Sequence, residues 1–355
     1  MMHAPRESRI PLIEQALVGV DIGGTKVAAG IVDSGGVLLR QSRKPMAARG
    51  SAAEGLAAVT GALDALFDEA LFNGASSDLA SLRAIGICSP GPLDPSRGLI
   101  VNPPNLPCWR NFPLGAELAR IYGVPVHLDN DGNAAALAET IWGAGRGYKN
   151  VFYASLGTGI GTGIVLNGRI YHGRTGAAAE GGHVSIDYRG PQCACGKRGC
   201  IEVFASGPAI ARRAREFVAT KPGSASTLLQ FAGGSPDAIT SEMVGKAYVA
   251  GDRAAREVLE TTVQLLSLWL GNMIDLLDPD VLILGGGVST MLHPFFDGIR
   301  NLLPSSCINS RCREIPLLAA HYGEDAGIAG GAALCARLAG CEDLHSLSHG
   351  HTDSG

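Results

Sequence analysis

One histidine and three cysteines lie close together in the middle of the chain, with the spacing His-x9-Cys-x-Cys-x4-Cys. They are His183, Cys193, Cys195 and Cys200. Gly196 and Gly199 permit the tight turns that would bring three thiolates onto one ion. Four nitrogen and sulfur ligands complete a tetrahedral structural zinc site, and cysteines separated by one residue do not readily form a disulfide. The spacing therefore predicts bound Zn²⁺, with unliganded core cysteines as the alternative.

Two glutamates flank these predicted ligands. Glu180 lies three residues before His183, and Glu202 lies two residues after Cys200. A metal ion that fixes the loop would also fix both carboxylates in space. Ionised carboxylates accept hydrogen bonds, which suits them to the neighbouring hydroxyls of a sugar. Each glutamate taken alone would more often be an exposed surface charge.

The segment Asp21-Ile-Gly-Gly-Thr-Lys26 has the composition of an anion-binding turn. Gly23 and Gly24 lack a Cβ atom, so backbone N–H groups can approach an anion closely. Thr25 adds a hydroxyl donor, and Asp21, at a predicted strand end, can hold hydrated Mg²⁺. The alternative is an ordinary hairpin turn.

A second glycine-rich turn, Gly157-Thr-Gly-Ile-Gly-Thr-Gly163, is another candidate phosphate cradle. It does not satisfy G-x-G-x-x-G, and a strand rather than a helix is expected after it, so a dinucleotide-binding fold is disfavoured. The chain has no G-x-x-x-x-G-K-[ST] motif, which excludes a Walker-type site. Two opposed phosphate cradles that bind one anion together would explain why neither of these motifs is present.

Three polar residues, Asp129, Asn130 and Asp131, crowd the predicted start of an alanine-rich helix. One of them is expected to cap the helix. Three such side chains are more than one cap needs, so the group is also a candidate for chemistry.

The elements that must position these residues follow a repeated order. Residues 17–39 and 151–171 both read as strand, glycine turn, strand, tight turn and strand. This duplication predicts two lobes that face each other, each with a glycine turn at the cleft. Hydrophobic periodicity predicts further helices at 52–72, 113–122, 133–142, 207–218, 253–277 and 326–338. Further strands are expected at 82–88, 124–128 and 281–284.

The expected domains follow from this order. A small α/β lobe would span 17–129, completed by the helix near 326–338, and a larger α/β lobe with the zinc loop would span 130–325. Polar tails are expected at 1–16 and 341–355. The tail histidines are expected in a solvated, disordered end, and metal binding by them is the alternative. They are His345, His349 and His351.

Composition narrows the functional class. The 355 residues are 46% hydrophobic and 17% charged, with a formal net charge of −4. That is enough apolar material for two cores, and it provides no positive field for nucleic acid. The basic cluster Arg212, Arg213 and Arg215 is expected to form one solvated helix face.

The first twenty residues carry charges and no apolar signal segment, and no stretch is long enough to span a membrane. A cytoplasmic protein is expected, in which cysteines outside the cluster are buried small hydrophobes. These are Cys88, Cys108, Cys307, Cys312, Cys335 and Cys341.

Taken together, several motifs resemble the ROK family (repressors, open reading frames and kinases) of sugar kinases. They are Asp21-Ile-Gly-Gly-Thr-Lys26, Pro90-Gly-Pro92, Asn130-Asp-Gly-Asn133, Glu180-Gly-Gly-His183 and Cys193-Ala-Cys-Gly-Lys-Arg-Gly-Cys200. The resemblance covers roughly residues 18–338. One departure is Cys88-Ser89, where the family pattern has Gly-x before Pro-Gly.

The resemblance implies an α/β actin/hexokinase-like (ribonuclease H-like) fold with ATP and Mg²⁺ bound in the cleft. It implies Asp131 as the catalytic base, and the zinc-bound histidine facing the sugar through its other ring nitrogen. The implied sugar contacts are Asn105, Asn130, Asp131, Glu180, His183 and Glu202. The implied nucleotide contacts are Asp21, Gly23, Gly24, Thr25, Lys26, Gly157, Thr158, Gly159, Gly285 and Gly286.

The activity implied is ATP-dependent phosphorylation of a hexose, with glucose as the first choice because the Asn105 loop and the Glu180 motif look most like the glucokinases of the family. N-acetylmannosamine, N-acetylglucosamine and fructose are alternative substrates, and a kinase-like sugar-binding protein without turnover is another possibility. A sugar-responsive transcriptional regulator is less expected, because the segment before Asp21 is too short for a DNA-binding module. The resemblance also implies a homodimer.

Overall fold

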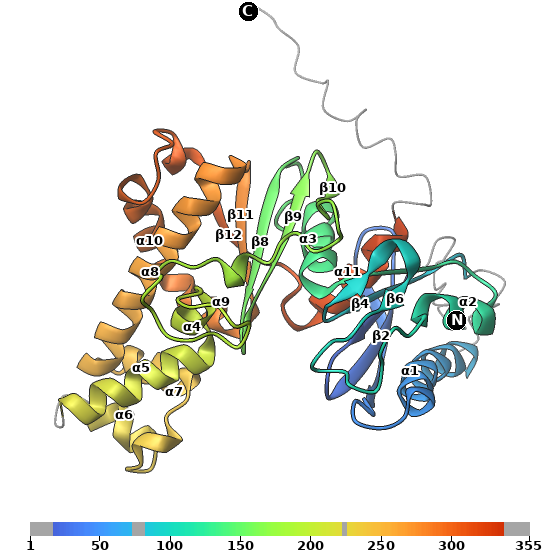
Figure 1. Cartoon of the computed structure of the whole chain (residues 1–355), viewed down its shortest axis with the longest axis horizontal. Helices are drawn as coiled ribbons and strands as arrows, with labels where there is room; N and C mark the ends of the chain where they lie inside the picture. Colours follow the sequence, from blue (N-terminus) through green and yellow to red (C-terminus); the bar gives the residue numbers. More distant parts are fainter. Residues whose placement is uncertain (1–16, 73–81, 222–225, 337–355) are drawn as a thin grey trace, which may run out of the picture. The chain divides into compact units, whose positions relative to one another are not determined.

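The computed structural model describes most of the chain (Figure 1). The described residues are 17–72, 82–221 and 226–336. Both predicted tails, with their histidines and Cys341, lie outside this part of the chain. The chain divides into two compact units: the first runs up to Ala134 and resumes at Gly327, and the second comprises Ala135–Ala326.

The first unit is built on a five-stranded sheet of order β3-β2-β1-β4-β7. Its strands are β1 (Leu17–Ile22), β2 (Lys26–Val32), β3 (Leu38–Pro45), β4 (Ile85–Ser89) and β7 (Val126–Asn130). Strands β1, β2 and β3 pair antiparallel as consecutive hairpins, whereas β4 pairs parallel to both β1 and β7. A small separate hairpin joins β5 (Leu93–Asp94) and β6 (Leu99–Ile100).

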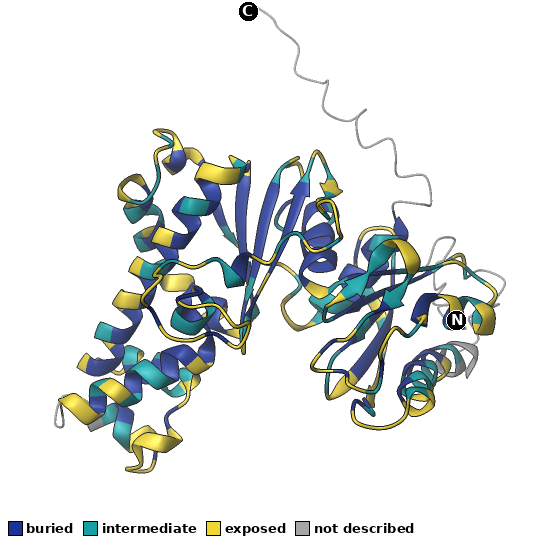
Figure 2. Cartoon of the chain, in the orientation of Figure 1, coloured by how far each residue is buried: buried dark blue, intermediate teal, exposed yellow. Residues whose placement is uncertain are grey.

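The two faces of this sheet have different partners because side chains alternate along a strand. Val18 and Val20 of β1 belong to one apolar core with residues of α1 (Ala52–Phe72) and α2 (Leu114–Tyr122). The alternate residues of β1, Gly19 and Asp21, face α11 (Ala326–Ala336) on the other side. Strands β1, β2 and β4 are almost entirely buried, whereas β3 at the edge of the sheet is half-buried or exposed (Figure 2).

Helix α11 approaches this second face backbone to backbone. A Cβ on Gly19 would lie 1.9 Å from the carbonyl oxygen of Ile328, and a Cβ on Gly86 would lie 1.8 Å from that of Gly331. Only glycine fits at such positions. Glycine therefore alternates with larger residues in β1 and β4 because the glycines lie on the face of the sheet against which α11 packs.

The second unit repeats the same sheet. Its order is β10-β9-β8-β11-β12, again with two antiparallel hairpins followed by two parallel neighbours. The strands are β8 (Val151–Leu156), β9 (Ile160–Leu166), β10 (Arg169–Ile170), β11 (Val281–Gly285) and β12 (Leu317–Ala319). The predicted duplication is thus confirmed at the level of strand order and direction.

Helices of the second unit pack around a large core that includes Phe152 and Trp269, whose rings meet edge to face at 5.6 Å. The helices are α4 (Glu202–Ala205), α5 (Gly207–Thr220), α6 (Ser226–Phe231), α7 (Ser241–Val249), α8 (Arg253–Leu277), α9 (Gly286–Leu292) and α10 (Phe296–Leu302). Helix α8 has its predicted bounds, and the side chain of Asp252 caps its start by accepting a hydrogen bond from Ala255 N. A capping residue of this kind makes the start of a helix easier to predict from the sequence.

Helix α3 (Asp131–Ile141) begins two residues earlier than predicted, and β7 ends at Asn130 rather than at Leu128. Strand and helix are therefore joined without a loop. The fully buried carboxylate of Glu139, in the last turn of α3, accepts hydrogen bonds from the backbone N–H groups of Ala144, His321 and Tyr322 at 2.8, 2.8 and 3.1 Å.

Two expectations about side-chain exposure need correction. Arg213 and Arg215 are not a solvated face, because their guanidinium groups donate hydrogen bonds to the backbone oxygens of Val258 and Ile239. Among the cysteines expected to be buried, Cys108 and Cys307 are only half-buried, whereas Cys88, Cys312 and Cys335 are buried.

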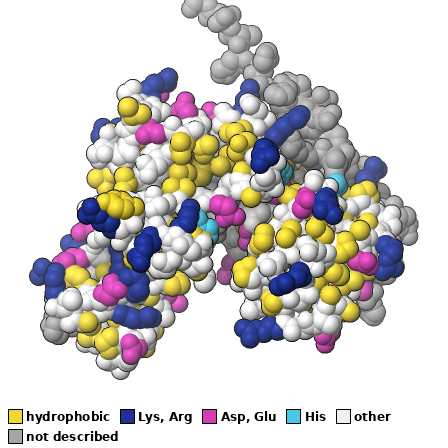
Figure 3. Space-filling model, in the orientation of Figure 1, with side chains coloured by type: hydrophobic (Ala, Val, Ile, Leu, Met, Phe, Trp, Pro, Cys, Tyr) yellow, Lys and Arg dark blue, Asp and Glu magenta, His cyan; other side chains and the backbone are white. Residues whose placement is uncertain are grey.

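The surface carries mixed charges. On the face drawn in Figure 3, Lys and Arg side chains are interspersed with Asp and Glu over both units. No helix within the described residues is long and apolar enough to cross a membrane.

The close approach of α11 generates a stability prediction. Gly86→Ala should lower the free energy of unfolding by about 3 kcal/mol, because its Cβ would force the helix backbone away from β4. Gly61→Ala is the matched control, because no atom lies within 4 Å of the added Cβ in α1. The control should be neutral or stabilising by roughly 0.5–1 kcal/mol. Urea titration followed by circular dichroism measures both, and equal effects of the two substitutions would contradict the packing argument.

Candidate active site

Three side chains lie in a row at the carboxyl ends of the parallel strands of the first unit. Asp21 of β1 pairs with Cys88 of β4, and Cys88 pairs with Asp129 of β7. Parallel partners in register project to the same face, so this edge of the sheet gathers two carboxylates around one thiol. The carboxyl edge of parallel strands is where α/β folds commonly bind ligands.

Asp21 is closely enclosed at this edge. The thiol of Cys88 lies 3.6 Å from its Oδ1 atom, and a Cβ on Gly327 would lie 2.3 Å from its Cγ atom. Burial raises the pKa of the Asp21 carboxyl, and the hydrogen bond from Cys88 opposes that rise. Burial and the nearby carboxylates raise the pKa of the Cys88 thiol well above its usual value, so it remains a protonated donor.

The three polar residues at the start of α3 have distinct roles. Asp129 is buried, and its Oδ1 accepts hydrogen bonds from Asn130 N and from the side-chain amide of Asn133. Asn130 caps the helix, since its Oδ1 accepts a hydrogen bond from Gly132 N at 2.9 Å. Asp131 is exposed, and its Oδ1 also accepts from Gly132 N, at 2.8 Å. Asp131 is thus the member of the group whose carboxylate is accessible to a substrate.

The first glycine turn is closed by a hydrogen bond from Gly23 N to Lys26 O at 2.9 Å. Thr25 and Lys26 are exposed, so both polar side chains are accessible at the turn. A Cβ on Gly24 would lie 3.0 Å from the backbone oxygen of Asn105. The turn and the Asn105 loop, both predicted as binding segments, are therefore neighbours in the first unit.

The second glycine turn belongs to the second unit and joins β8 to β9. Gly157 N donates to Gly159 O at 2.9 Å, and Gly157 O accepts from Gly207 N at the start of α5. Thr158 is exposed at its tip. A Cβ on Gly286 would lie 2.4 Å from Leu156 O, so the glycines between β11 and α9 allow that segment to pack beside the end of β8.

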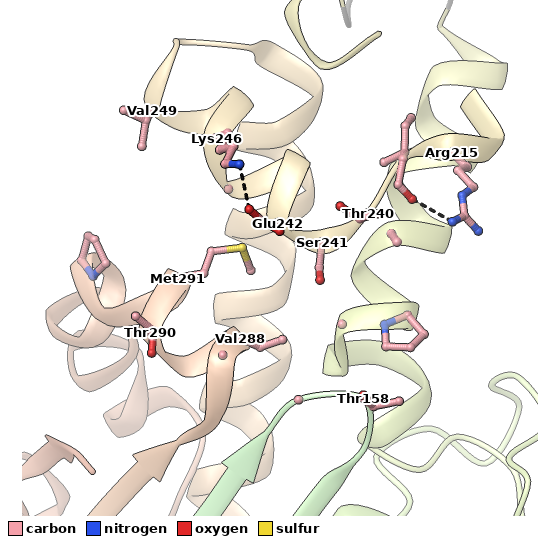
Figure 4. A pocket seen from close by; sticks show the side chains of 18 residues that line it. Thr158, Arg215, Thr240, Ser241, Glu242, Lys246, Val249, Val288, Thr290 and Met291 are labelled. Carbon is pink, nitrogen blue, oxygen red and sulfur yellow. Dashed lines mark hydrogen bonds and ion pairs between the residues drawn. The ribbon is translucent and has the colours of Figure 1, made fainter. Parts of the chain in front are cut away.

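A cavity of about 940 Å³ lies beside this turn, entirely within the second unit (Figure 4). Helices α5, α7 and α9 form its walls, and Gly157 and Thr158 form one end. Val288 and Met291 contribute apolar surface, and the hydroxyl of Ser241 is drawn facing the space between the helices. The size and the mixed lining are typical of a pocket for a small organic ligand.

Sequence reasoning identified only the glycine end of this cavity. The wall residues on α5 and α7 were missed, since they lie on ordinary amphipathic helices without a motif. Two of these residues, Glu242 and Lys246, form an ion pair of 2.7 Å on α7. From the sequence alone, this pair is indistinguishable from an ordinary i, i+4 ion pair on a helix surface.

The predicted metal ligands come together in the second unit. The ligand atoms of the His183, Cys193, Cys195 and Cys200 set lie within 4.8 Å of one another. Cys195 Sγ and Cys200 Sγ are 3.7 Å apart, as are Cys193 Sγ and His183 Nδ1. A tetrahedral ion with zinc–sulfur bonds near 2.3 Å requires sulfurs about 3.8 Å apart. The donor set therefore fits Zn²⁺.

The Glu-Gly-Gly-His segment is held against β9 and α8. Gly181 O accepts a hydrogen bond from the indole N–H of Trp269 at 3.0 Å, and Gly181 N donates to Thr162 Oγ1 at 2.8 Å. A Cβ on Gly182 would lie 1.9 Å from Ile160 O. Gly182 is thus required by packing, which the sequence analysis did not recognise.

The glutamates that flank the metal ligands differ in their surroundings. Glu180 is exposed next to the buried Gly181. Glu202 is half-buried: its Oε2 accepts a hydrogen bond from Ile160 N at 2.9 Å, and its Oε1 lies 3.9 Å from His183 Nδ1. Glu202 is therefore hydrogen-bonded at the end of the second glycine turn and lies close to the histidine of the metal set.

The predicted site residues are divided between the two units. The first unit holds Asp21, Gly23, Gly24, Thr25, Lys26, Asn105, Asn130 and Asp131. The second unit holds Gly157, Thr158, Gly159, Glu180, His183, Cys193, Cys195, Cys200, Glu202, Gly285 and Gly286. Cys88 is an addition to these sets that only the strand register reveals.

Comparison with known proteins places this arrangement in context. The sequence matches the profile of the ROK family over residues 17–337. The glucokinase of Thermotoga maritima is 34% identical over 318 residues, which cover 90% of this chain and 96% of that protein. The glucokinase of Streptomyces coelicolor is 33% identical over 324 residues, covering 89% of this chain and 96% of that protein.

A solved structure gives the same result. The ROK family glucokinase from Streptomyces griseus, in complex with glucose and AMPPNP, has a TM-score of 0.75 at 34% identity, covering 91% of this chain and 99% of that one. This likeness confirms the predicted α/β actin/hexokinase-like fold, of which the repeated sheet is the hallmark. Since the family profile and these relatives both extend over nearly the whole sequence, the chain belongs to the ROK family.

Proposed function

We propose that this chain phosphorylates a hexose hydroxyl with ATP, with glucose as the first candidate and glucose 6-phosphate as the product. The placement of Asp131 carries the proposal: it is the exposed carboxylate at the first residue of α3, beside a buried Asp129 whose Oδ1 already accepts two hydrogen bonds. The glucokinases among the relatives, one of them crystallised with glucose and AMPPNP, support this pair of substrates.

Asp131 acts as the general base of the transfer. It accepts the proton of the sugar hydroxyl while that oxygen attacks the γ-phosphorus in line, and the bond from phosphorus to the bridging oxygen breaks to release ADP. The hydrogen bond from Gly132 N holds the Asp131 carboxylate in place, which limits the reorganisation needed for proton transfer. Asn130, which caps the same helix, adds a polar group for the sugar.

The cavity of the second unit is the proposed site of the nucleoside. Its apolar walls suit a planar base, and its end at Gly157 and Thr158 presents backbone and hydroxyl donors suited to phosphate oxygens. The first glycine turn, in the first unit, is the other proposed phosphate-binding turn. It comprises Gly23, Gly24, Thr25 and Lys26, and Lys26 supplies positive charge. Mg²⁺, when bound with the nucleotide, offsets phosphate charge, and Asp21 is the proposed carboxylate for its water ligands.

The metal set is proposed to hold a structural Zn²⁺ that does no chemistry. Four protein ligands leave no open position for water or substrate. The ion would fix His183 and, through it, the segment that begins at Glu180. Glu180, Glu202 and Asn105 are the further proposed sugar contacts, and the second ring nitrogen of His183 completes them.

The family resemblance supports further proposals for alternative sugars, location and assembly. N-acetylmannosamine, N-acetylglucosamine and fructose are the alternative sugars, because their kinases share the same kinds of groups. The cytoplasm is the proposed location and a homodimer the proposed assembly.

A substrate panel tests the proposed activity. With ATP, kcat/KM for glucose should exceed that for N-acetylmannosamine, N-acetylglucosamine and fructose by at least about tenfold, the discrimination that pocket shape can supply. A coupled assay of ADP formation measures it. A preference for an N-acetylhexosamine would replace glucose as the substrate, and no ADP formation with any sugar would refute the kinase.

Removal of the base tests the mechanism. Asp131→Asn should lower kcat by about 10² to 10⁴ and leave the glucose dissociation constant nearly unchanged, because the amide cannot accept the proton. Steady-state kinetics and calorimetry give the two quantities. Glu117→Gln, which neutralises a carboxylate of the surface ion pair with Arg120, is the control and should be silent. Near-normal turnover in Asp131→Asn would eliminate this residue as the base.

Removal of one metal ligand tests the role of zinc. Native protein should contain about one zinc ion per chain, and Cys195→Ser should lose it and bind glucose at least about tenfold more weakly. Elemental analysis and calorimetry measure the two effects. Cys108→Ser, a half-buried thiol outside the metal set, is the control. Freshly purified protein without zinc would contradict the assignment.

A further inference from the structure

Cys88 stands where the ROK pattern has a glycine, and its side chain projects into the acidic edge of the first sheet. It is fully buried at the carboxyl end of β4, in register between Asp21 of β1 and Asp129 of β7. A glycine here would leave the two carboxylates without a group between them. The thiol is therefore a buried group at this edge that the proposed mechanism has not used.

The contacts of the thiol are specific. Cys88 Sγ lies 3.6 Å from Asp21 Oδ1 and 3.2 Å from the backbone oxygen of Gly327. Among the described residues, Cys88 is the hydrogen-bond donor to the Asp21 carboxylate. The close packing of Gly327 against Asp21 leaves no room for a larger donor on that side.

We propose that Cys88 is a positioning residue for Asp21: its S–H group donates to Oδ1 and fixes the carboxylate, leaving Oδ2 as the oxygen not engaged by the thiol. This inference rests on the proposed function in one respect, namely that Asp21 serves the Mg²⁺ that accompanies the nucleotide. Cys88 would act only through Asp21, which its thiol contacts.

A thiol suits this position for electrostatic reasons. A neutral donor orders the carboxylate without cancelling its charge, whereas a lysine or arginine would neutralise the acid that attracts the cation. A thiol is also a weak donor, so Asp21 Oδ1 keeps most of its capacity to accept hydrogen bonds from metal-bound water. Alanine would remove the donor and leave the strand geometry intact.

The single proton of the thiol has two possible acceptors, and vibrational spectroscopy distinguishes them. The S–H stretching band of Cys88 is identified as the band that disappears in Cys88→Ala. If the proton is donated to Asp21, this band should shift to higher frequency in Asp21→Asn, because a neutral amide oxygen accepts more weakly than a carboxylate. An unshifted band would mean that the proton is donated to Gly327 O, which would overturn the proposal.

Nucleotide binding supplies a second readout that does not depend on turnover. Calorimetry with ADP, with and without Mg²⁺, gives the factor by which the metal strengthens binding. In Cys88→Ala this factor should fall about fivefold, the size expected from one lost hydrogen bond, while binding of ADP without metal is unchanged. Cys88→Ser, which keeps a donor, should remain within about twofold of the native factor.

Cys335→Ala is the matched control. Cys335 is a second buried thiol of the first unit, and its nearest recorded acceptor is the backbone oxygen of Val18 at 4.0 Å. The Cys335→Ala protein should lose a similar amount of stability. The factor by which Mg²⁺ strengthens ADP binding, called the metal factor here, should not change. A fall of the factor in both alanine variants would mean that general loosening of the core is responsible, and would overturn the positioning role.

The outcomes separate this inference from the function on which it rests. If Asp21→Asn abolishes the metal factor but Cys88→Ala leaves it native, Asp21 keeps its role and the positioning role of Cys88 is refuted. If Asp21→Asn leaves the factor native, the proposed magnesium role of Asp21 is refuted together with this inference. A fall in Cys88→Ala, rescue in Cys88→Ser and a shifted S–H band together support it.

Discussion

The register of three parallel strands is the constraint on which the first unit depends. Asp21, Cys88 and Asp129 come from segments far apart in the chain, and they meet because β1, β4 and β7 are hydrogen-bonded in one alignment. A slip of one residue in any of these pairings would turn a side chain to the opposite face of the sheet. Glycines 19, 86 and 331 secure the alignment from the other side, because helix α11 packs there on bare backbone.

The second unit uses the same sheet for a different purpose. Its glycine turn lies beside a cavity walled by helices, while its Glu-Gly-Gly-His segment is tied to β9 and α8 by Thr162 and Trp269. Glu202 connects these regions, since one carboxylate oxygen accepts from Ile160 N and the other lies near His183. The hydrogen bonds of Glu202, Thr162 and Trp269 limit the movement of these segments, which a binding site requires for its preorganisation.

Much of the fold could be predicted from the sequence because its signals are local. The repeated strand and turn pattern, the bounds of α8 with its Asp252 cap, and the spacing of the cysteines each depend on residues near one another in the chain. The missed features depend on distant partners. Cys88 and Asp21 are 67 residues apart, Arg215 bonds to the carbonyl of Ile239, and Glu139 bonds to the backbone at His321. The roles of Asp129 and Asp131 also required the structure, because only burial separates the engaged carboxylate from the accessible one.

The hydrogen bond between Trp269 and Gly181 gives the chain an internal optical probe. Indole emission responds to the polarity and hydrogen bonding around its N–H group, and this indole is bonded to the residue that follows Glu180. The chain has only three tryptophans, and Trp109 is stacked on Phe112 within the first unit. With Trp109 and Trp142 replaced by phenylalanine, the remaining indole fluorescence would come from Trp269, so a change at its hydrogen bond to Gly181 could be followed in solution without an attached dye.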